Sequence, residues 1–300
     1  MSEIMQRVCF QTEYEIMRER PFEIMALCDM RREEKACTFI EHEKYLALIP
    51  DNVVMVFTTP QLLSKLDLER YGTVITENPK VCFFKVHNFL GADASYIGRQ
   101  GIKQTFISPE AKISDRAVLV GDNIRIEDGV VIEPFVSIYS NVHIGKNSII
   151  RSGTCIGGEG FEYKKMTDGI LAVRHFGGVV IGENVEIQNN SCVDKAVYPW
   201  DVTVIGNHVK IDNLVHIAHG VKIDDGTMVV AGTVVGGRVF IGKNAWIGMG
   251  ANIRNGLRIG KNARVNMGAV VTKDVLDGQS VTGNFAISHS RFISHMKSLD

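Results

Sequence analysis

The chain has 300 residues, of which 45% are hydrophobic and 22% charged, a balance typical of a folded soluble protein rather than a fibre or a disordered chain. Its formal net charge of −1 gives no excess of positive charge for binding nucleic acid or an anionic membrane. The N-terminus has no signal-peptide core, and the most apolar stretch, residues 228–237, is too short to span a bilayer. We therefore expect a cytoplasmic protein with no transmembrane segment and no nucleic-acid partner.

Residues 1–100 predict a small α/β domain that ends in a linker over 91–104. Thr59 and Asn78 each precede a proline, which predicts the start of a helix, and Gly91 is expected to end the second helix at its C′ position. Three β-rich runs predict strands: residues 22–27, 53–57 and 72–75.

From Ile205 to Val271 an isoleucine or valine recurs at every sixth residue, with a small or apolar residue four positions after each. The same step occurs over 107–119, 126–156 and 181–193. A period of six is not helical, but it suits short strands joined by two-residue corners, which Gly, Asn and Asp form readily. A repeat of this kind marks a solenoid.

Three such hexads make one triangular turn, so we expect a mainly β protein with a left-handed parallel β-helix over 101–283. β-Branched and small residues fill every inner position, which predicts a solid prism with its functional groups on corners, loops and neighbouring subunits. Residues 284–300 predict a short C-terminal helix over the last turn, with Phe292, Met296 and Leu299 on one face.

Two segments interrupt the repeat. Residues 157–178 break it for more than a full turn, whereas residues 195–203 leave its phase unchanged. A long loop expelled from a compact solenoid is more often functional than accidental, and a tolerated surface insertion is the alternative.

Six cysteines are scattered without a C-x-x-C pair, which indicates reduced thiols rather than a disulfide framework or a zinc knuckle. They are Cys9, Cys28, Cys37, Cys82, Cys155 and Cys192.

Several segments together resemble one enzyme family. They are IGGEGFEY (156–163), GGVVIGENVEI (177–187), the pair Asp194-Lys195, TVIGNHVKIDNLVHIAHGVKI (203–223), CTFIEHEKYL (37–46) and ENPKVCFFKV (77–86). Over nearly its whole length the chain is similar to the UDP-3-O-acylglucosamine N-acyltransferases of lipid A synthesis. The resemblance implies a homotrimer that moves an acyl group from a thioester to the amine of a nucleotide-linked amino sugar, in grooves between neighbouring prisms.

His219 follows the inward Ile217 by two residues, so it is expected at a corner, pointing outward. An imidazole suits the removal of the proton that the attacking amine loses. The resemblance implies that His219 is the general base and that the Gly237 backbone N–H stabilises the oxyanion. Asp212 is expected to orient the base or, with Asn213, to hold the sugar; a plain corner turn is the alternative.

His208, His216 and His219 raise the question of zinc, which three histidines bind in β-helical carbonic anhydrases. However, His216 is expected to point outward from a strand and His208 lies at another corner, so we expect no metal and no tightly bound cofactor, and assign His216 to substrate binding. A metal-dependent hydratase and a non-catalytic β-helical scaffold are the alternatives from other classes.

The resemblance places a uridine site at Phe39, His42 and Tyr45, where two aromatic rings six residues apart would sandwich a pyrimidine. The family usually has asparagine in place of His42, and two core aromatics of a small domain are the alternative. Phe161 and Tyr163, on the expelled loop, are expected to line the sugar or acyl groove.

The chain departs from the family in two places. Gly256 stands where the family has a second imidazole, and the C-terminal extension that meets acyl carrier protein is short. Residues 270–286 instead resemble the final turn of hexapeptide transferases that use coenzyme A, with Lys273 and Gly283 expected at the donor site. Acyl-CoA and acyl carrier protein therefore stay open as co-substrates, and the amino sugar of another surface glycan stays open as acceptor.

Overall fold

The computed structural model describes the chain except residues 10–11, 31, 98–103, 284–285, 287 and 299–300 and the side chains of Ala94 and Met296. The chain forms two compact units. Unit 1 comprises Met1–Gln104, Glu159–Gly178 and Lys195–Val202, and unit 2 comprises Thr105–Gly158, Val179–Asp194 and Thr203–Asp300. Among the helices that the structure describes, none has the length and apolar character needed to cross a membrane.

The two units differ from the expected boundaries, which kept loop 157–178 and its neighbour with the β-helix. Instead, both expelled segments add to the core of unit 1, where Val173 and Tyr198 are buried. Trp200 Nε1 donates a hydrogen bond to the carbonyl oxygen of Met25 at 2.9 Å. A solid prism leaves no room for the apolar side chains of an expelled loop, so they pack in another core.

Unit 1 is built on a five-stranded sheet in the order β1-β5-β4-β3-β2, in which only β1 is antiparallel to its neighbour. Its strands are β1 (Tyr14–Arg18), β2 (Ile24–Met25), β3 (Ala36–Ile40), β4 (Val53–Thr58) and β5 (Gly72–Thr76). Its other elements are α1 (Ser2–Val8), η1 (Glu43–Leu48), η2 (Pro60–Lys65), α2 (Pro79–Gly91), α3 (Ala94–Ile97) and the hairpin β15 (Tyr163–Met166) and β16 (Gly169–Ala172). The predicted run 22–27 contains β2, and the runs 53–57 and 72–75 match β4 and β5 to within one residue, whereas α1, β1 and β3 were not predicted.

Both predicted helix starts are confirmed, although Thr59 opens a 3₁₀ helix rather than an α-helix. The predicted role of Gly91 is wrong. Gly91 is the last helical residue of α2, and Ala92 follows it with φ −79°. A Cβ on Gly91 would collide with the ring of Phe176, so close packing, and not a left-handed turn, requires glycine at this position.

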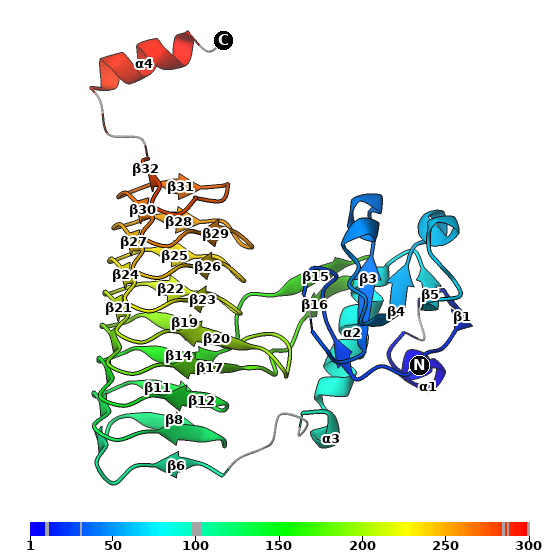
Figure 1. The fold of residues 1–300 in the computed structure, drawn as a ribbon, viewed down its shortest axis with the longest axis horizontal. Helices are drawn as coiled ribbons and strands as arrows, with labels where there is room; N and C mark the ends of the chain where they lie inside the picture. The colour runs from blue at the N-terminus through cyan, green and yellow to red at the C-terminus, as the bar shows by residue number, and fades with distance from the viewer. Residues whose placement is uncertain (10–11, 31, 98–103, 284–285, 287, 299–300) are drawn as a thin grey trace. The chain divides into compact units, whose positions relative to one another are not determined.

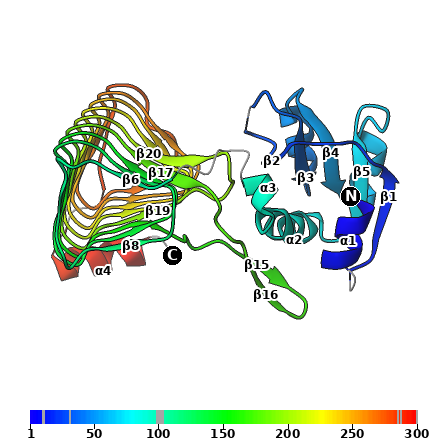
Figure 2. The ribbon, with the colours of Figure 1, turned by 90° about the horizontal axis from the view of Figure 1, so that it is seen from below.

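Unit 2 is a left-handed parallel β-helix of three sheets, and successive turns add one strand to each sheet (Figure 1). Viewed from below in Figure 2, its coils stack into a triangular outline. Sheet 1 contains β6 (Phe106–Ile107), β9 (Ile124–Ile126), β12 (Val142–Ile144), β17 (Gly178–Ile181), β20 (Val202–Ile205), β23 (Lys222–Ile223), β26 (Phe240–Ile241) and β29 (Arg258–Ile259).

The other two sheets repeat the same ladder. Sheet 2 contains β7 (Lys112–Ile113), β10 (Val131–Ile132), β13 (Ile149–Ile150), β18 (Glu186–Ile187), β21 (Lys210–Ile211), β24 (Met228–Val229), β27 (Trp246–Ile247), β30 (Arg264–Val265) and β32 (Ser280–Val281). Sheet 3 contains β8 (Val118–Val120), β11 (Ser137–Tyr139), β14 (Cys155–Gly158), β19 (Cys192–Asp194), β22 (His216–Ile217), β25 (Val234–Val235), β28 (Asn252–Ile253) and β31 (Val270–Val271).

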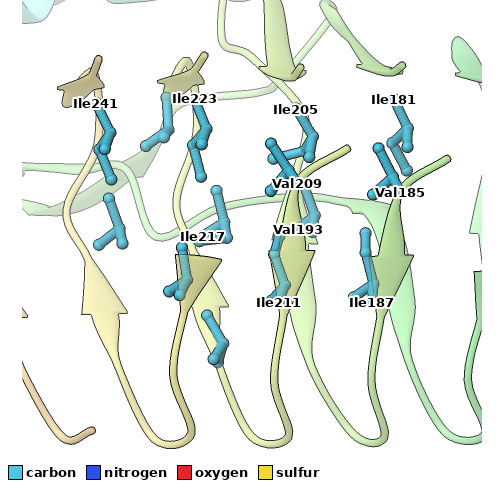
Figure 3. Close-up of a cluster of buried hydrophobic side chains, with 14 of the residues drawn as sticks. Ile181, Val185, Ile187, Val193, Ile205, Val209, Ile211, Ile217, Ile223 and Ile241 are labelled. Atoms are coloured by element: carbon cyan, nitrogen blue, oxygen red, sulfur yellow. The ribbon is translucent and has the colours of Figure 1, made fainter. Parts of the chain in front are cut away.

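The predicted inward positions are confirmed. The twelve hexad positions from Ile205 to Val271 are each at most 6% exposed. Figure 3 shows Ile205, Ile223 and Ile241 among the side chains stacked inside the prism. Burial of each such side chain stabilises the fold by about 1.5–3 kcal/mol, so the repeat itself supplies most of the driving force.

The C-terminal helix is shorter than predicted. Helix α4 spans His289–Lys297, and Phe292 is 47% exposed rather than packed over the last turn. The expected position of Leu299 lies outside the described residues, as does the side chain of Met296.

Candidate functional site

One corner between sheets 3 and 1 brings His219 against Gly237. His219 follows β22 and is only 9% exposed, so it is more buried than an outward-pointing corner residue would be. A Cβ on Gly237 would lie 2.6 Å from Nε2 and 2.8 Å from Cε1 of His219. Only glycine at position 237 therefore leaves room for the His219 imidazole in this position.

Corners of the coil differ in how their backbone N–H groups are used. One hexad before Gly237 the N–H of Ala231 is bonded to Asp212 at 3.1 Å, and five hexads before it that of Asn207 is bonded to Asp225 at 2.7 Å. At Lys243 and Met249, one and two hexads after Gly237, no hydrogen bond donated by the N–H is found among the described residues. Within the part of the chain that the structure describes, the Gly237 N–H donates no hydrogen bond. A donor is thus available beside an imidazole, as the stabilisation of an oxyanion requires.

Asp194 belongs to a pair that carries the resemblance, but the sequence did not predict a role for it in the site. The residue is 4% exposed at the end of β19, with Oδ2 lying 3.7 Å from Nε2 of His216. Burial raises the pKa of the Asp194 carboxyl, and the positive charge of His216 and His219 opposes that rise. The carboxylate is therefore coupled electrostatically to both imidazoles.

The corner of His219 is tied to Asp194 through the backbone as well. Thr203 Oγ1 donates to the carbonyl oxygen of Asp194 at 2.6 Å and accepts the N–H of Gly220 at 2.9 Å. The hexad phase is the signal that could have found Asp194, which follows an inward valine at the hexad position of Asp212. The interruption at 195–203 hid this relation.

Asp212 and Asn213 lie at the other end of β22, between sheets 2 and 3. Asp212 Oδ1 accepts the N–H of Asn213 at 2.7 Å, and its Oδ2 accepts that of Ala231 at 3.1 Å. Asn213 Oδ1 accepts the N–H of Asn189 at 3.1 Å. Both side chains are used as corner caps, so the expectation that Asp212 orients His219 is not met.

The three histidines considered for zinc do not converge. His208 is an exposed corner residue before β21, with φ 60°, whereas His216 projects from β22 in sheet 3. The alternative of a three-histidine zinc centre within this chain therefore loses its geometric basis.

In unit 1 the predicted uridine residues fall into two groups. Phe39 lies on β3, half-buried, with its ring 5.1 Å from that of Phe83. The rings of His42 and Tyr45 are 6.2 Å apart, where η1 begins. Among the described ring contacts none joins Phe39 to Tyr45, so the alternative of a core aromatic applies in part to Phe39.

Phe161 and Tyr163 form an exposed aromatic pair beside the hairpin of unit 1. Their ring centroids are 4.8 Å apart, and the two residues are 87% and 49% exposed. Two adjacent exposed rings form a small apolar patch, which is consistent with a binding role.

The predicted donor residues differ in character. Lys273 is exposed after β31, as a phosphate contact would require. A Cβ on Gly283 would lie 2.7 Å from the carbonyl oxygen of Gly268, so close packing of the last coil explains this glycine without a ligand.

A hollow of about 670 Å³ lies on the outer face of sheet 1 and was not predicted. The Arg258 guanidinium in this hollow lies 4.3 Å from the centre of the Phe240 ring. The charged lining of the hollow is balanced and comprises Lys243, Arg258, Lys261, Asp224, Asp274 and Asp277. The repeated IGKN segments that place Lys243 and Lys261 one turn apart are the signal that could have found it.

Comparison with known proteins agrees with this architecture. The model of the bacterial transferase hexapeptide family, described as six repeats, matches residues 123–158, 203–237 and 238–273. A UDP-N-acetylglucosamine acyltransferase of Francisella novicida superposes with a TM-score of 0.51 at 26% identity, covering 65% of this chain and 72% of that one. The fold and repeats define a hexapeptide-repeat protein of the left-handed β-helix class.

More specific relatives carry one activity in their names. The chain is 30% identical over 207 residues to a UDP-3-O-acylglucosamine N-acyltransferase of Coxiella burnetii, covering 61% of this chain and 58% of the relative. It is 41% identical over 98 residues to a protein of the same name in Pseudomonas fluorescens, covering 33% and 27%. Among hexapeptide-repeat proteins, the chain is thus similar to UDP-3-O-acylglucosamine N-acyltransferases, of which its matches span about a quarter to just over half.

Proposed function

We propose that the protein is an N-acyltransferase, which moves an acyl group from a thioester to the amine of a nucleotide-linked amino sugar. The observation that carries this proposal is the His219 imidazole packed against Gly237, whose N–H has no acceptor among the described residues. The names of the relatives support the acceptor class.

In this reaction the amine nitrogen attacks the carbonyl carbon of the thioester. His219 takes the proton that the amine loses, and the Gly237 N–H donates to the oxygen that becomes negative. When the carbon–sulfur bond breaks, the proton held by His219 goes to the departing thiolate. Asp194 acts as a positioning residue, because its buried charge stabilises the protonated imidazole.

We assign the nucleotide of the acceptor to the segment containing Phe39, His42 and Tyr45. The His42–Tyr45 pair, with its rings 6.2 Å apart, and the half-buried Phe39 support an aromatic platform for a base. Phe161 and Tyr163 are assigned to the sugar or acyl groove, and Asn213 and His216 to sugar contacts.

Replacing Phe39 with alanine tests the base platform. Loss of a stacking ring worth about 1–3 kcal/mol is expected to raise the KM for the nucleotide sugar roughly tenfold, with little change in kcat. Steady-state kinetics measure both constants. An unchanged KM would place the base elsewhere.

We propose acyl-CoA or acyl carrier protein as the donor, bound near Lys273. Lys243, Arg258 and Lys261 in the hollow on sheet 1 supply ammonium and guanidinium groups that pair with phosphate. Asp224, Asp274 and Asp277 line the same hollow and balance this charge, and Asp277 lies 3.6 Å from Lys261. Both carriers present phosphate-linked pantetheine, so basic residues at this position could bind either donor. The transfer uses the donor as co-substrate and needs no tightly bound cofactor.

We also propose a cytoplasmic homotrimer. Support comes from exposed apolar residues at corners between sheets 2 and 3, where Phe135 is 63% and Leu214 66% exposed. Both residues adopt left-handed backbone, at φ 64° and 58°, a conformation that bulky side chains avoid. Met249 and Met267 are exposed at corners between the same two sheets, and a neighbouring copy would cover such side chains.

An amine-acylation assay with purified protein tests the proposal. It crosses acetyl- or hydroxybutyryl-CoA and a hydroxyacyl carrier protein with UDP-3-O-acylglucosamine and a UDP- or dTDP-linked aminodeoxy sugar. Mass spectrometry of an amide product identifies donor and acceptor, and separates lipid A synthesis from synthesis of another surface glycan. No amide product from any of the four combinations would contradict the proposal.

A further inference from the structure

Sheet 3 carries two thiols, a carboxylate and an imidazole side by side on its outer face. In the parallel ladder Cys155 pairs with Cys192, and Cys192 pairs with His216. Asp194 follows Cys192 by two residues, so both side chains leave the strand on the same face. Residues scattered through the sequence are thus brought to adjacent strands.

The separations of these groups match those of ligands around one ion. Cys192 Sγ lies 3.4 Å from Oδ1 of Asp194, and His216 Nε2 lies 3.7 Å from Oδ2. One ligand atom of each of the three residues lies within 4.8 Å of the others. In a tetrahedral zinc site, with bonds of about 2.0–2.3 Å, neighbouring donor atoms are about 3.3–3.8 Å apart.

Cys155 pairs with Cys192 on the neighbouring strand but lies outside the group of three residues whose donor atoms are within 4.8 Å of one another. All six cysteines of the chain are free. One sulfur, one nitrogen and one oxygen form a donor set that suits zinc and disfavours magnesium or calcium, which prefer oxygen.

Burial and access also fit a resident ion. Asp194 is buried, whereas the two cysteines are half-buried and the side chain of His216 is 42% exposed. A buried carboxylate is costly unless a cation or hydrogen bonds compensate its charge. The open side at His216 gives an ion a route to the carboxylate.

We propose that Cys192, Asp194 and His216 form a binding site for a zinc-class divalent metal. A metal bound there neutralises the Asp194 carboxylate, which then stabilises the protonated His219 imidazole less. Bound metal is therefore expected to slow acyl transfer, a consequence that rests on the proposed function, whereas the binding itself does not.

Cobalt titration of the full-length, reduced and metal-stripped protein tests the site. One equivalent of Co²⁺ is expected to give the visible absorption of a tetrahedral site and a sulfur-to-cobalt charge-transfer band, both lost on adding Zn²⁺. Replacing an outer partner of a metal site costs ~10–100-fold in affinity, so Cys192→Ser, which removes a direct ligand, is expected to lose at least ~100-fold. Cys28→Ser, which removes a half-buried thiol of unit 1, is the matched control.

Absence of a thiolate band at one equivalent, or a band unchanged in Cys192→Ser, would overturn the proposal. X-ray absorption of the zinc-loaded wild type, which needs no variant to fold, is expected to show a sulfur ligand; oxygen and nitrogen alone would overturn it equally. An intact cobalt spectrum with zinc-insensitive turnover would support the site and refute its coupling to His219.

Discussion

The two corners at the ends of strand β22 use the same repeat for opposite purposes. At one end Asp212 and Asn213 satisfy the neighbouring backbone N–H groups, so the corner is closed. At the other end His219 faces Gly237, whose N–H is not capped within the described residues. Among the described residues Lys243 and Met249 also have an uncapped corner N–H, so the difference teaches that such a donor becomes a candidate for chemistry only where an imidazole packs against it.

The largest effect is expected when the imidazole is removed, which tests this comparison most severely. His219→Ala is expected to lower kcat by ~10²–10⁴-fold, the usual contribution of a general base, while the β-helix stays folded. Product formation by mass spectrometry and circular dichroism measure the two effects. Near-normal turnover in a folded variant would place the base elsewhere.

The next test crowds the imidazole without removing it. Gly237→Ala puts a Cβ 2.6 Å from Nε2 of His219, and a displacement of about 1 Å is expected to cost roughly 100-fold in kcat. Gly250→Ala is the matched control, because its site has φ 65° and nothing within 4 Å. That control is expected to lose about 1 kcal/mol of unfolding free energy and to keep the activity of wild type. Equal kcat values in the two variants would contradict the account.

A buried imidazole without a carboxylate provides a further contrast in unit 1. His87 is packed among Phe84, Phe176 and Tyr198, and its Nε2 bonds to the carbonyl oxygen of Arg174 at 3.0 Å. Burial lowers the pKa of His87 to about 4, below its value in the unfolded chain.

The unfolded chain therefore binds the His87 proton more tightly than the folded chain does. Above the unfolded pKa the neutral, buried His87 costs no stability, and the free energy of unfolding falls as the pH drops toward the folded pKa. Between pH 7 and pH 5 the free energy of unfolding is expected to drop by about 2 kcal/mol through His87. Denaturant unfolding of wild type and His87→Leu measures the difference, with His208→Gln as the exposed control. The same pH slope in His87→Leu as in wild type would contradict this.

The smallest effect is expected at the closed corner. Asp212→Asn replaces one of two accepting oxygens by a donor and is expected to cost about 1 kcal/mol of unfolding free energy. Its turnover is expected to stay close to that of wild type. A loss of turnover without a loss of stability would show that this corner takes part in the reaction.

The sequence predicted the β-helix because a hexad repeat codes each inward side chain locally, as Ile205 and its successors show. It predicted unit 1 less well, since short strands such as β1 show no repeating hydrophobic pattern. The glycine at position 91 is required by a contact with Phe176, which is distant in the sequence. His219 and Gly237 are one turn apart and were found together. Asp194 was missed, because an expelled segment separates it from the coil on which it acts.

The most direct test of the central claim compares turnover of His219→Ala and Asp212→Asn in one assay, with a donor and an acceptor that the wild type converts. Mass spectrometry of the amide product gives both rates at equal protein concentration. The account predicts a loss of at least ~100-fold for His219→Ala and a rate near wild type for Asp212→Asn. Equal losses in the two variants, with both folded, would contradict it.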